Sequence, residues 1–361
     1  MYLFQKKYIG ETLILILIFS LFSIGLLMLY SATHGITSDY SYLFLKQVTG
    51  MICGVIIIIF ISQIPYKTII AWGMCGHYLT LVLLLITLAI GYTAMGAQRW
   101  LNLGFIKFQP SELAKVTLPL WVVHYFLTEV IAKPTYHNWI HVISMIIVTA
   151  LLIIKQPDLG SGLVVGASGM ILLYIMGLPN KIIVQIILLI GLMIPIAWHN
   201  LHDYQKKRIL VFLGNGSVHK ERYQLEQSKI AVGSGGFYGK GFLKGTQKNF
   251  NFLPEFRTDF IFAVLAEEFG FLGCITIIIL YTFLLMRFVV QCMKINDYYA
   301  FILSCGLISP LMISIICNIG MVIGLLPIVG IPLPCISYGV THIWGTCFTI
   351  GIINSILSSS D

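Results

Sequence analysis

The apolar residues of this chain come in long blocks, and no other feature limits its fold so strongly. Residues 13–29 and 51–61 contain almost no polar side chain. A membrane-spanning helix needs about 20 predominantly apolar residues, whereas a helix of a soluble protein needs only one apolar face. Charged residues make up 10% of the sequence, against about 25% in soluble domains. The sequence therefore predicts a polytopic membrane protein.

We predict an all-α bundle of about ten transmembrane helices in a single integral membrane domain, residues 1–361. Residues 13–29 follow Lys6 and Lys7 as in a signal peptide, but the apolar run is long for one and no convincing cleavage site follows it. We therefore assign it to the first span. The ten predicted spans lie near residues 11–31, 47–64, 68–91, 110–128, 139–154, 159–178, 180–198, 259–286, 298–324 and 338–357.

The positions of Lys and Arg predict the orientation of the bundle. With a cytoplasmic N-terminus, the inner segments hold seven basic residues and the short outer segments hold four. This bias has the sign of the positive-inside rule. An even number of spans then places both termini in the cytoplasm. A large extracytoplasmic loop, about residues 199–258, joins the seventh span to the eighth.

The predicted outer loop concentrates positive charge. It holds ten of the 22 Lys and Arg residues and four acidic residues, in a chain of net charge +8. One explanation is attraction to anionic lipid headgroups, and the other is a site for an anionic substrate such as a phosphate or pyrophosphate. A nucleic-acid partner is not expected, because the loop would lie outside the cell. The eight cysteines avoid this loop and form no CxxC pair, so we expect neither a disulfide framework nor a zinc site.

Asp259 is the first candidate for chemistry. It stands where a polar loop ends and an apolar helix begins, and a carboxylate at that depth is costly unless something pairs with it or uses it. Near the water boundary it could act as a general base. The deeper Glu267, roughly 12 Å further along an ideal helix, would be protonated or need partners. The alternative for Asp259 is a helix N-cap, a role that Thr258 could also fill.

Three other polar positions are expected at the same outer level of the membrane. Glu112 and Lys115 are i,i+3 neighbours on one helix face. They form either a structural ion pair or a pair that orients a ligand. Asp158 either caps the following helix or belongs to the site. Ser337 either donates its hydroxyl to a cavity or packs.

Two segments are too rich in proline or glycine for regular helix. Residues 327–334 contain three prolines. Because irregular backbone at membrane depth must be buried or line a wet cavity, this segment is expected to fold back against a cavity or to form a tight outer loop. Residues 233–245 are glycine-rich but match neither a dinucleotide-binding turn nor a P-loop. Their amides beside Lys244 could cradle a phosphate, or the segment has no chemical role. Gly162 and Gly166 predict close helix packing.

Many short motifs together resemble one family, the SEDS (shape, elongation, division, sporulation) proteins, over essentially the whole chain. Phe108 and the short N-terminal tail favour the elongation branch over the division branch. The motifs are Gly96-Ala-Gln-Arg-Trp100, Phe108-Gln-Pro-Ser-Glu-Leu-Ala-Lys115, Gln156-Pro-Asp-Leu-Gly160, Gln227-Ser-Lys-Ile-Ala-Val-Gly-Ser-Gly-Gly236, Gly239-Lys-Gly241, Gly245-Thr-Gln247, Phe252-Leu-Pro-Glu255, Thr258-Asp-Phe-Ile-Phe-Ala-Val264 and Pro332-Leu-Pro334.

The resemblance implies a peptidoglycan glycosyltransferase that polymerises lipid II. The donor would be a growing strand on a polyprenyl pyrophosphate, and the acceptor a GlcNAc hydroxyl of a new lipid II. The family's essential aspartate falls on Asp259, and its Glu–Lys pair on Glu112 and Lys115. Asp259 is then expected to act as general base. Cationic side chains or a divalent cation such as Mg²⁺ or Mn²⁺ would stabilise the leaving pyrophosphate.

The resemblance also implies partners and a location. We expect a class B penicillin-binding protein as cognate transpeptidase, the elongation machinery, and the bacterial cytoplasmic (inner) membrane. The residues expected to bind substrate are Arg99, Trp100, Gln109, Asp158, Arg208, Lys244, Gln247, Arg257 and Ser337.

The chain departs from the family pattern in places, and two other functions stay open. Arg257 stands where the family usually has His, and it is expected to lower the pKa of Asp259. Val340, Thr341 and His342 add bulk beside the expected cavity. A flippase for a polyprenyl-linked precursor would also use a many-helix bundle with buried charges. Because the charges cluster at the outer face, the enzyme is favoured. The third alternative is a scaffold that has lost its activity.

Overall fold

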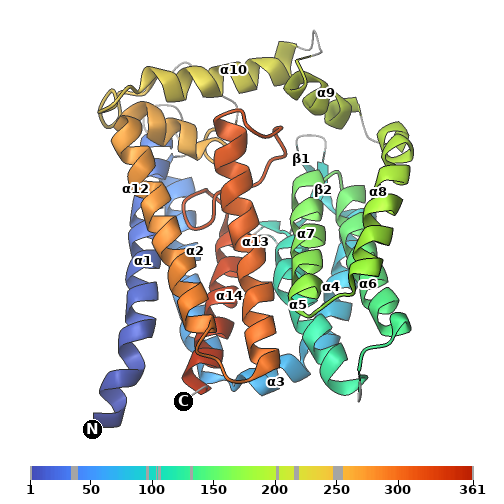
Figure 1. Ribbon diagram of the computed structural model, residues 1–361. Coiled ribbons are helices and arrows are strands. Elements are labelled where there is room, and N and C mark those ends of the chain that lie inside the picture. The colour runs from blue at the N-terminus through green and yellow to red at the C-terminus, as the bar shows by residue number, and fades with distance from the viewer. Residues whose placement is uncertain are drawn as a thin grey trace.

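Helices make up most of the computed structural model (Figure 1), which describes residues 2–33, 40–94, 97–102, 104, 107–130, 133–200, 203–214, 219–246 and 255–359. The helices are α1 Tyr2–Thr33, α2 Tyr40–Gln63, α3 Tyr66–Ala71, α4 Gly73–Ile90, α5 Pro110–Thr128, α6 Tyr136–Lys155, α7 Leu159–Ile175, α8 Asn180–Asn200, α9 Asp203–Phe212, α10 His219–Ser234, α12 Ile261–Cys292, α13 Tyr298–Val322 and α14 Val340–Ser359. Three short strands complete the described elements, β1 Tyr92–Ala94, β2 Ala97–Asn102 and β3 Lys107–Phe108.

Nine of the ten predicted spans each coincide with one helix, and the span predicted at 68–91 covers α3 and α4. Within the described ranges, seven helices are long and apolar enough to cross a membrane, and α7 and α8 hold shorter apolar segments. The one remaining predicted span, 110–128, is α5, whose first turns carry Glu112 and Lys115. The prediction of a helical, multi-pass membrane protein is confirmed.

Three boundaries differ from the prediction for local reasons. The span predicted at 68–91 is divided at Trp72 into α3 and α4. Here α4 approaches α5 so closely that a Cβ on Gly73 would lie 2.6 Å from the carbonyl oxygen of Leu120. Helix α12 ends at Cys292 rather than near 286, and it kinks at Gly270, whose φ of 63° is not helical. Helix α2 begins at Tyr40, seven residues before the predicted start.

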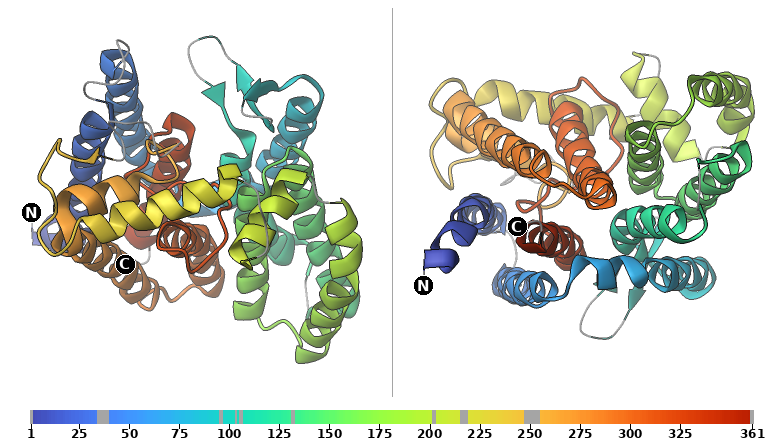
Figure 2. Two further views of the ribbon diagram at one scale, coloured as in Figure 1. Left: turned by 90° about the horizontal axis from the view of Figure 1, so that it is seen from above. Right: turned by 60° about the horizontal axis from the view of Figure 1, so that its bottom comes forward.

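The predicted outer loop contains two helices that the hydropathy pattern did not reveal. Helices α9 and α10 are polar, so their sequences lack the long apolar blocks of the spans. In Figure 1 they lie across one end of the bundle, and Figure 2 shows α10 crossing over it from above. They carry much of the positive charge of the loop over that end.

The small antiparallel sheet is an exception to the all-α prediction. Its strand order is β1-β2-β3. Tyr92 pairs with Trp100 and Leu101 pairs with Phe108. The sheet stands just before α5, at the same end of the bundle as α9 and α10 (Figure 1). It therefore fixes the position of Arg99 and Trp100 at that end.

Helices of the bundle pack closely where glycines allow it. A Cβ on Gly162 of α7 would lie 2.5 Å from Cγ1 of Ile154 on α6, and one on Gly166 would lie 3.6 Å from Cβ of Ala150. The predicted close approach at this glycine pair is confirmed. Elsewhere α14 packs along α2 and α4 packs along α5.

The N- and C-terminal helices begin and end at the same end of the bundle, opposite α9 and α10 (Figure 1). An even number of membrane crossings between the two termini accounts for this arrangement. It also separates the end that carries the polar helices and the sheet from the end that carries the termini.

Candidate active site

A cavity of about 430 Å³ lies at the end of the bundle that carries the sheet and α9. Three carboxylates and four cationic side chains line it, contributed by segments far apart in sequence. Its wall is formed by α2, β2, β3, the start of α5, α7, α9, the turn before α12, the proline-rich segment after α13 and the start of α14. The charged residues in its wall are Glu112, Glu255, Asp259, Lys46, Arg99, Lys107 and Arg208.

Asp259 lies in a turn that immediately precedes α12. The helix begins at Ile261 with Phe260 as its N-cap residue, and no side chain caps it. Both cap alternatives are therefore wrong: Asp259 faces the cavity, and Thr258 Oγ1 donates to the Glu255 carboxylate at 3.2 Å. The carboxylate of Asp259 is left available for chemistry.

The backbone around Asp259 is held by two polar side chains. Asn318 of α13 donates from Nδ2 to the carbonyl oxygens of Asp259 (2.9 Å) and Ile331 (2.7 Å). Ser337 donates from Oγ to the carbonyl oxygen of Thr258 at 2.6 Å. The proline-rich segment thus folds back against the cavity, as one of the two predictions had it. Ser337 is fully buried and its hydroxyl contacts backbone, which is the packing alternative for this residue.

The surroundings of Asp259 shift its proton affinity. The side chain keeps part of its surface toward the cavity, yet burial is the largest effect and, with the neighbouring Glu255, raises its pKa to about 6. Arg208, Arg99 and a hydrogen bond with Thr258 lower the pKa and oppose this shift. Arg257 is not among the groups that shift the pKa of Asp259, and its guanidinium carbon lies 5.1 Å from the centre of the Phe256 ring. The expectation that Arg257 lowers the pKa of Asp259 was wrong.

Glu112, Lys115 and His342 form a buried cluster, of which Glu112 and His342 line the cavity. Lys115 Nζ lies 2.6 Å from Glu112 Oε1, and His342 Nδ1 lies 2.9 Å from Glu112 Oε2. The predicted ion pair is confirmed, and each carboxylate oxygen has its own partner. Val340, Thr341 and His342 at the start of α14 line the cavity, as expected. His342 also contacts the carboxylate of the Glu112–Lys115 pair.

Asp158 holds two of the expected binding residues in place. Its carboxylate accepts from Gln109 Nε2 at 2.9 Å and lies 3.7 Å from Arg99 Nη1. It also accepts from the backbone N–H of Ser161, so it caps α7 as one alternative proposed. The Arg99 guanidinium carbon lies 5.8 Å from the Trp100 ring centre. Arg99, Trp100 and Gln109 line the cavity, while Asp158 lies behind them.

Besides Asp158, three of the expected binding residues that the structure describes are not in the cavity wall: Lys244, Arg257 and Ser337. Lys244 sits in the glycine-rich segment, which packs on α12 near Glu267 instead. Arg257 lies in the turn before α12, where its backbone carbonyl accepts from the N–H of Tyr338 and its guanidinium lies over the Phe256 ring. Gln247 lies outside the described residues. Ser337 is also outside the wall, because it is fully buried and its hydroxyl donates to the backbone carbonyl oxygen of Thr258.

Sequence reasoning missed several cavity residues. Lys46 and Lys107 entered only the orientation count, and Glu255 only a motif, yet all three line the cavity. The sequence did contain one signal for them, because each of the three charged residues stands just before a predicted span. Only the packing of distant helices shows that these positions meet.

We looked in the described residues for side chains that could together coordinate a metal ion. Among the residues that the structure describes, no group of three or more His, Cys, Asp and Glu is placed to hold one. The positive charge that faces the cavity comes from Lys and Arg side chains.

Comparisons with known proteins agree with this architecture. A family model described as cell cycle protein, for the FtsW, RodA and SpoVE proteins, matches residues 11–361. The chain is 38% identical over 355 residues to the peptidoglycan glycosyltransferase MrdB of Escherichia coli, covering 98% of this chain and 94% of the relative. It is 36% identical over 321 residues to MrdB of Helicobacter pylori, covering 87% and 83%.

Solved structures share the fold. A chain from a study of a peptidoglycan synthase complex that coordinates polymerization and crosslinking has a TM-score of 0.82 and 24% identity, covering 96% of this chain and 98% of that one. The rod shape determining protein RodA of Thermus thermophilus has a TM-score of 0.71 and 22% identity, covering 96% of each chain. Together with the match along nearly the whole sequence, this shows that the chain belongs to the FtsW, RodA and SpoVE family, the SEDS proteins.

Proposed function

We propose that this protein is a peptidoglycan glycosyltransferase that polymerises lipid II into glycan strands for cell elongation and rod shape. The observation that carries the proposal is one cavity holding Asp259 together with Arg99 and Arg208. A carboxylate beside two guanidinium groups suits a reaction that removes a proton and releases a pyrophosphate. The names of the relatives, peptidoglycan glycosyltransferases, support the same reaction class.

In the proposed reaction, a hydroxyl of the acceptor sugar attacks the anomeric carbon of the donor. The new C–O bond forms as the bond to the pyrophosphate oxygen breaks, and the hydroxyl proton passes to Asp259. Because its pKa is raised to about 6, Asp259 is mostly ionised at pH 7 and still basic enough to accept a proton. One displacement inverts the anomeric centre, so no second nucleophilic carboxylate is needed.

The cations of the cavity stabilise the leaving group. Negative charge grows on the pyrophosphate as the bond breaks, and guanidinium groups held in place lower the energy of that state. Asp158 and the Trp100 ring hold Arg99, and the Ile328 carbonyl oxygen accepts from Arg208 Nη1 at 3.2 Å. Lys46 and Lys107 add positive charge to the same wall. A divalent cation bound with the substrate would supplement this charge.

The cluster of Glu112, Lys115 and His342 is proposed to shape the cavity floor. The charges of Glu112 and Lys115 are paired with each other, so the cluster can orient a sugar or a hydroxyl without leaving an unpaired carboxylate or ammonium in the membrane. Glu112 and Lys115 are therefore assigned a positioning role in catalysis.

We further propose that the cavity faces the outside of the bacterial cytoplasmic membrane and that both termini are cytoplasmic. The termini lie at the end opposite the cavity (Figure 1), as this orientation requires. A class B penicillin-binding protein is the proposed partner. The similar chain from a complex that couples polymerization to crosslinking supports it.

The test is glycan formation from labelled lipid II by the purified chain, with and without its transpeptidase partner, for wild type and Asp259→Asn. Polymer from wild type alone is the expected result. If neither protein makes polymer although the partner is present, the glycosyltransferase proposal fails. Transport of labelled lipid II across vesicles would then establish the flippase, and binding without turnover or transport the inactive scaffold.

A further inference from the structure

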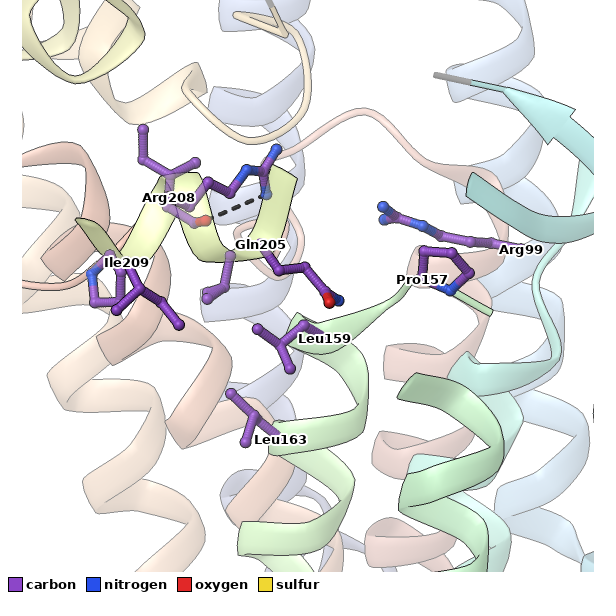
Figure 3. A pocket seen from close by; sticks show the side chains of 10 residues that line it. Arg99, Pro157, Leu159, Leu163, Gln205, Arg208 and Ile209 are labelled. Carbon is purple, nitrogen blue, oxygen red and sulfur yellow. Dashed lines mark hydrogen bonds between the residues drawn. The ribbon is translucent and has the colours of Figure 1, made fainter. Parts of the chain in front are cut away.

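A second, smaller cavity adjoins the active-site cavity and differs from it in character. It measures about 120 Å³ and lies between α7, α9 and residues 327–329. Figure 3 shows Leu159 and Leu163 reaching toward it from α7, with Ile209 on α9 beside them. We call this space the α7–α9 groove. Its wall is mostly apolar, in contrast to the charged wall around Asp259.

The two spaces meet at a pair of arginines. Arg99 and Arg208 line both the α7–α9 groove and the active-site cavity. Gly330 marks how close the base is to this junction: a Cβ there would lie 3.2 Å from Asp259 Oδ2 and 3.9 Å from Arg208 Nη1. The order in space is therefore carboxylate and polar cavity, then two guanidinium groups, then an apolar groove.

We propose that the α7–α9 groove holds the isoprenoid unit next to the pyrophosphate of the donor's lipid carrier, with the pyrophosphate on Arg99 and Arg208. The inference rests on the proposed glycosyltransferase function. A polyprenyl pyrophosphate-linked sugar has the same order of parts: a polar sugar, a doubly charged linker and an apolar chain. Guanidinium groups match phosphate oxygens in geometry and charge.

The size of the groove fits one part of that chain. A cavity of ~150 Å³ lined by Leu, Ile and Phe holds one benzene molecule. A groove of about 120 Å³ therefore has room for one five-carbon isoprene unit. The rest of the carrier must leave toward lipid, and Leu163 at the rim is 52% exposed on the surface of α7. The groove thus connects the reacting end of the donor with the bilayer.

The arginines favour the donor over the other lipid substrate. Only the donor loses its pyrophosphate in the reaction, so only its linker needs cations where charge develops. The acceptor contributes a hydroxyl and keeps its own pyrophosphate. A phospholipid tail is the competing occupant, since it shares the apolar chain but not the prenyl pyrophosphate.

The first experiment fills the groove. Leu163→Trp should raise KM for lipid II with its full-length carrier about tenfold, the scale on which pocket shape discriminates substrates. KM for lipid II with a carrier shortened to a single isoprene unit should rise as well, because that unit occupies the groove. The matched control is Leu151→Trp, a residue of α6 that is 51% exposed and does not line the groove. It should leave both KM values unchanged.

The second experiment reads binding without turnover. A farnesyl pyrophosphate that carries a photoreactive diazirine on its first isoprene unit should label α7 or α9 in wild type and label Leu163→Trp much less. Unlabelled farnesyl pyrophosphate should displace it, and farnesol should not. A diazirine phospholipid that labels the groove equally well, and that farnesyl pyrophosphate does not displace, would overturn the proposal.

Different results would contradict the groove assignment and the glycosyltransferase function. If wild type polymerises lipid II while Leu163→Trp keeps the wild-type KM and labelling, the groove assignment is wrong and the function stands. If wild type makes no polymer but the prenyl probe still labels α7 or α9, the glycosyltransferase assignment is wrong and the groove remains a prenyl pyrophosphate site.

Discussion

Two groups of acidic residues near the start of α12 have opposite surroundings. Asp259 faces a cavity, and the cations that act on it are side chains that also line that cavity. Glu267 is fully buried and its Oε1 accepts from Lys240 Nζ (2.7 Å) and from the backbone and side chain of Thr246. The first carboxylate is open to a substrate, whereas the second is saturated by the protein itself.

This difference distinguishes acidic residues with a structural role from those available for catalysis. Glu268 likewise accepts from Ser31 Oγ on α1, at 2.6 and 2.7 Å. These contacts tie the glycine-rich segment and α1 to α12. A buried carboxylate whose oxygens accept hydrogen bonds from other segments links those segments, while a carboxylate that faces a cavity is available for reaction. Variants on the two sides should therefore lose different properties.

The largest effect is expected for Asp259→Asn. Removing the general base should lower the rate of lipid II polymerisation about 10²- to 10⁴-fold. The thermal midpoint in detergent should stay at or above that of wild type, because the substitution replaces a partly buried ionised carboxylate with a neutral amide. Polymerisation assays and thermal unfolding of the same preparation check this. A normal rate in a folded variant would remove Asp259 from the mechanism.

Glu267→Gln should show the reverse pattern. Lys240 loses its charged partner, which should cost about 1–3 kcal/mol of stability and lower the thermal midpoint. Activity per folded molecule should change far less than in Asp259→Asn. The control is Glu226→Gln, because the exposed pair of Glu226 with Arg222 should contribute almost nothing. Loss of activity with an unchanged midpoint would contradict the contrast.

Gly330→Ala should impair the Asp259 site without removing any charged group. Gly330 has a φ of 71°, and its added methyl group would lie 3.2 Å from Asp259 Oδ2. The polymerisation rate should fall about tenfold, since a small misplacement of a reacting group is costly. Gly177→Ala is the matched control: its φ is 89°, but nothing lies within 4 Å of the added carbon. Equal rate losses in both variants would mean that backbone strain alone is responsible.

The smallest effect concerns pH. Because the pKa of Asp259 is raised to about 6, activity should rise as pH increases through 6, where the carboxyl loses its proton. Glu255→Gln removes a negative neighbour, so the acidic limb should move to lower pH. Arg208→Gln removes a positive neighbour, so the limb should move to higher pH. Profiles of kcat/KM against pH measure both shifts, and identical limbs in all three proteins would show that another group titrates.

Much of the fold follows from the sequence alone. Apolar blocks of about 20 residues leave the backbone no partner in lipid except its own helix, so the spans can be recognised one by one. The pairing of Glu112 with Lys115 is likewise local, because residues three apart share a helix face. The glycine pair at 162 and 166 predicted close packing for a similarly local reason.

The polar helices and the strands at the cavity end of the bundle were harder to predict. Helices α9 and α10 lack the apolar blocks, and the strands β1–β3 are too short to show a pattern. Their positions depend on what they pack against at the end of the bundle. Lys244 illustrates the consequence: its sequence neighbourhood suggested a phosphate cradle, but packing on α12 carries it away from the cavity.

The sequence by itself determined that the chain spans a membrane, which family it resembles, and that Asp259 is an acid at the edge of an apolar helix. Only the tertiary structure decided which groups surround that acid. Arg99 comes from β2 and Arg208 from α9, and a contact between distant segments depends on how whole helices pack. The same packing decided that Arg208 rather than the adjacent Arg257 acts on Asp259, because proximity along the chain does not set the distance between side chains.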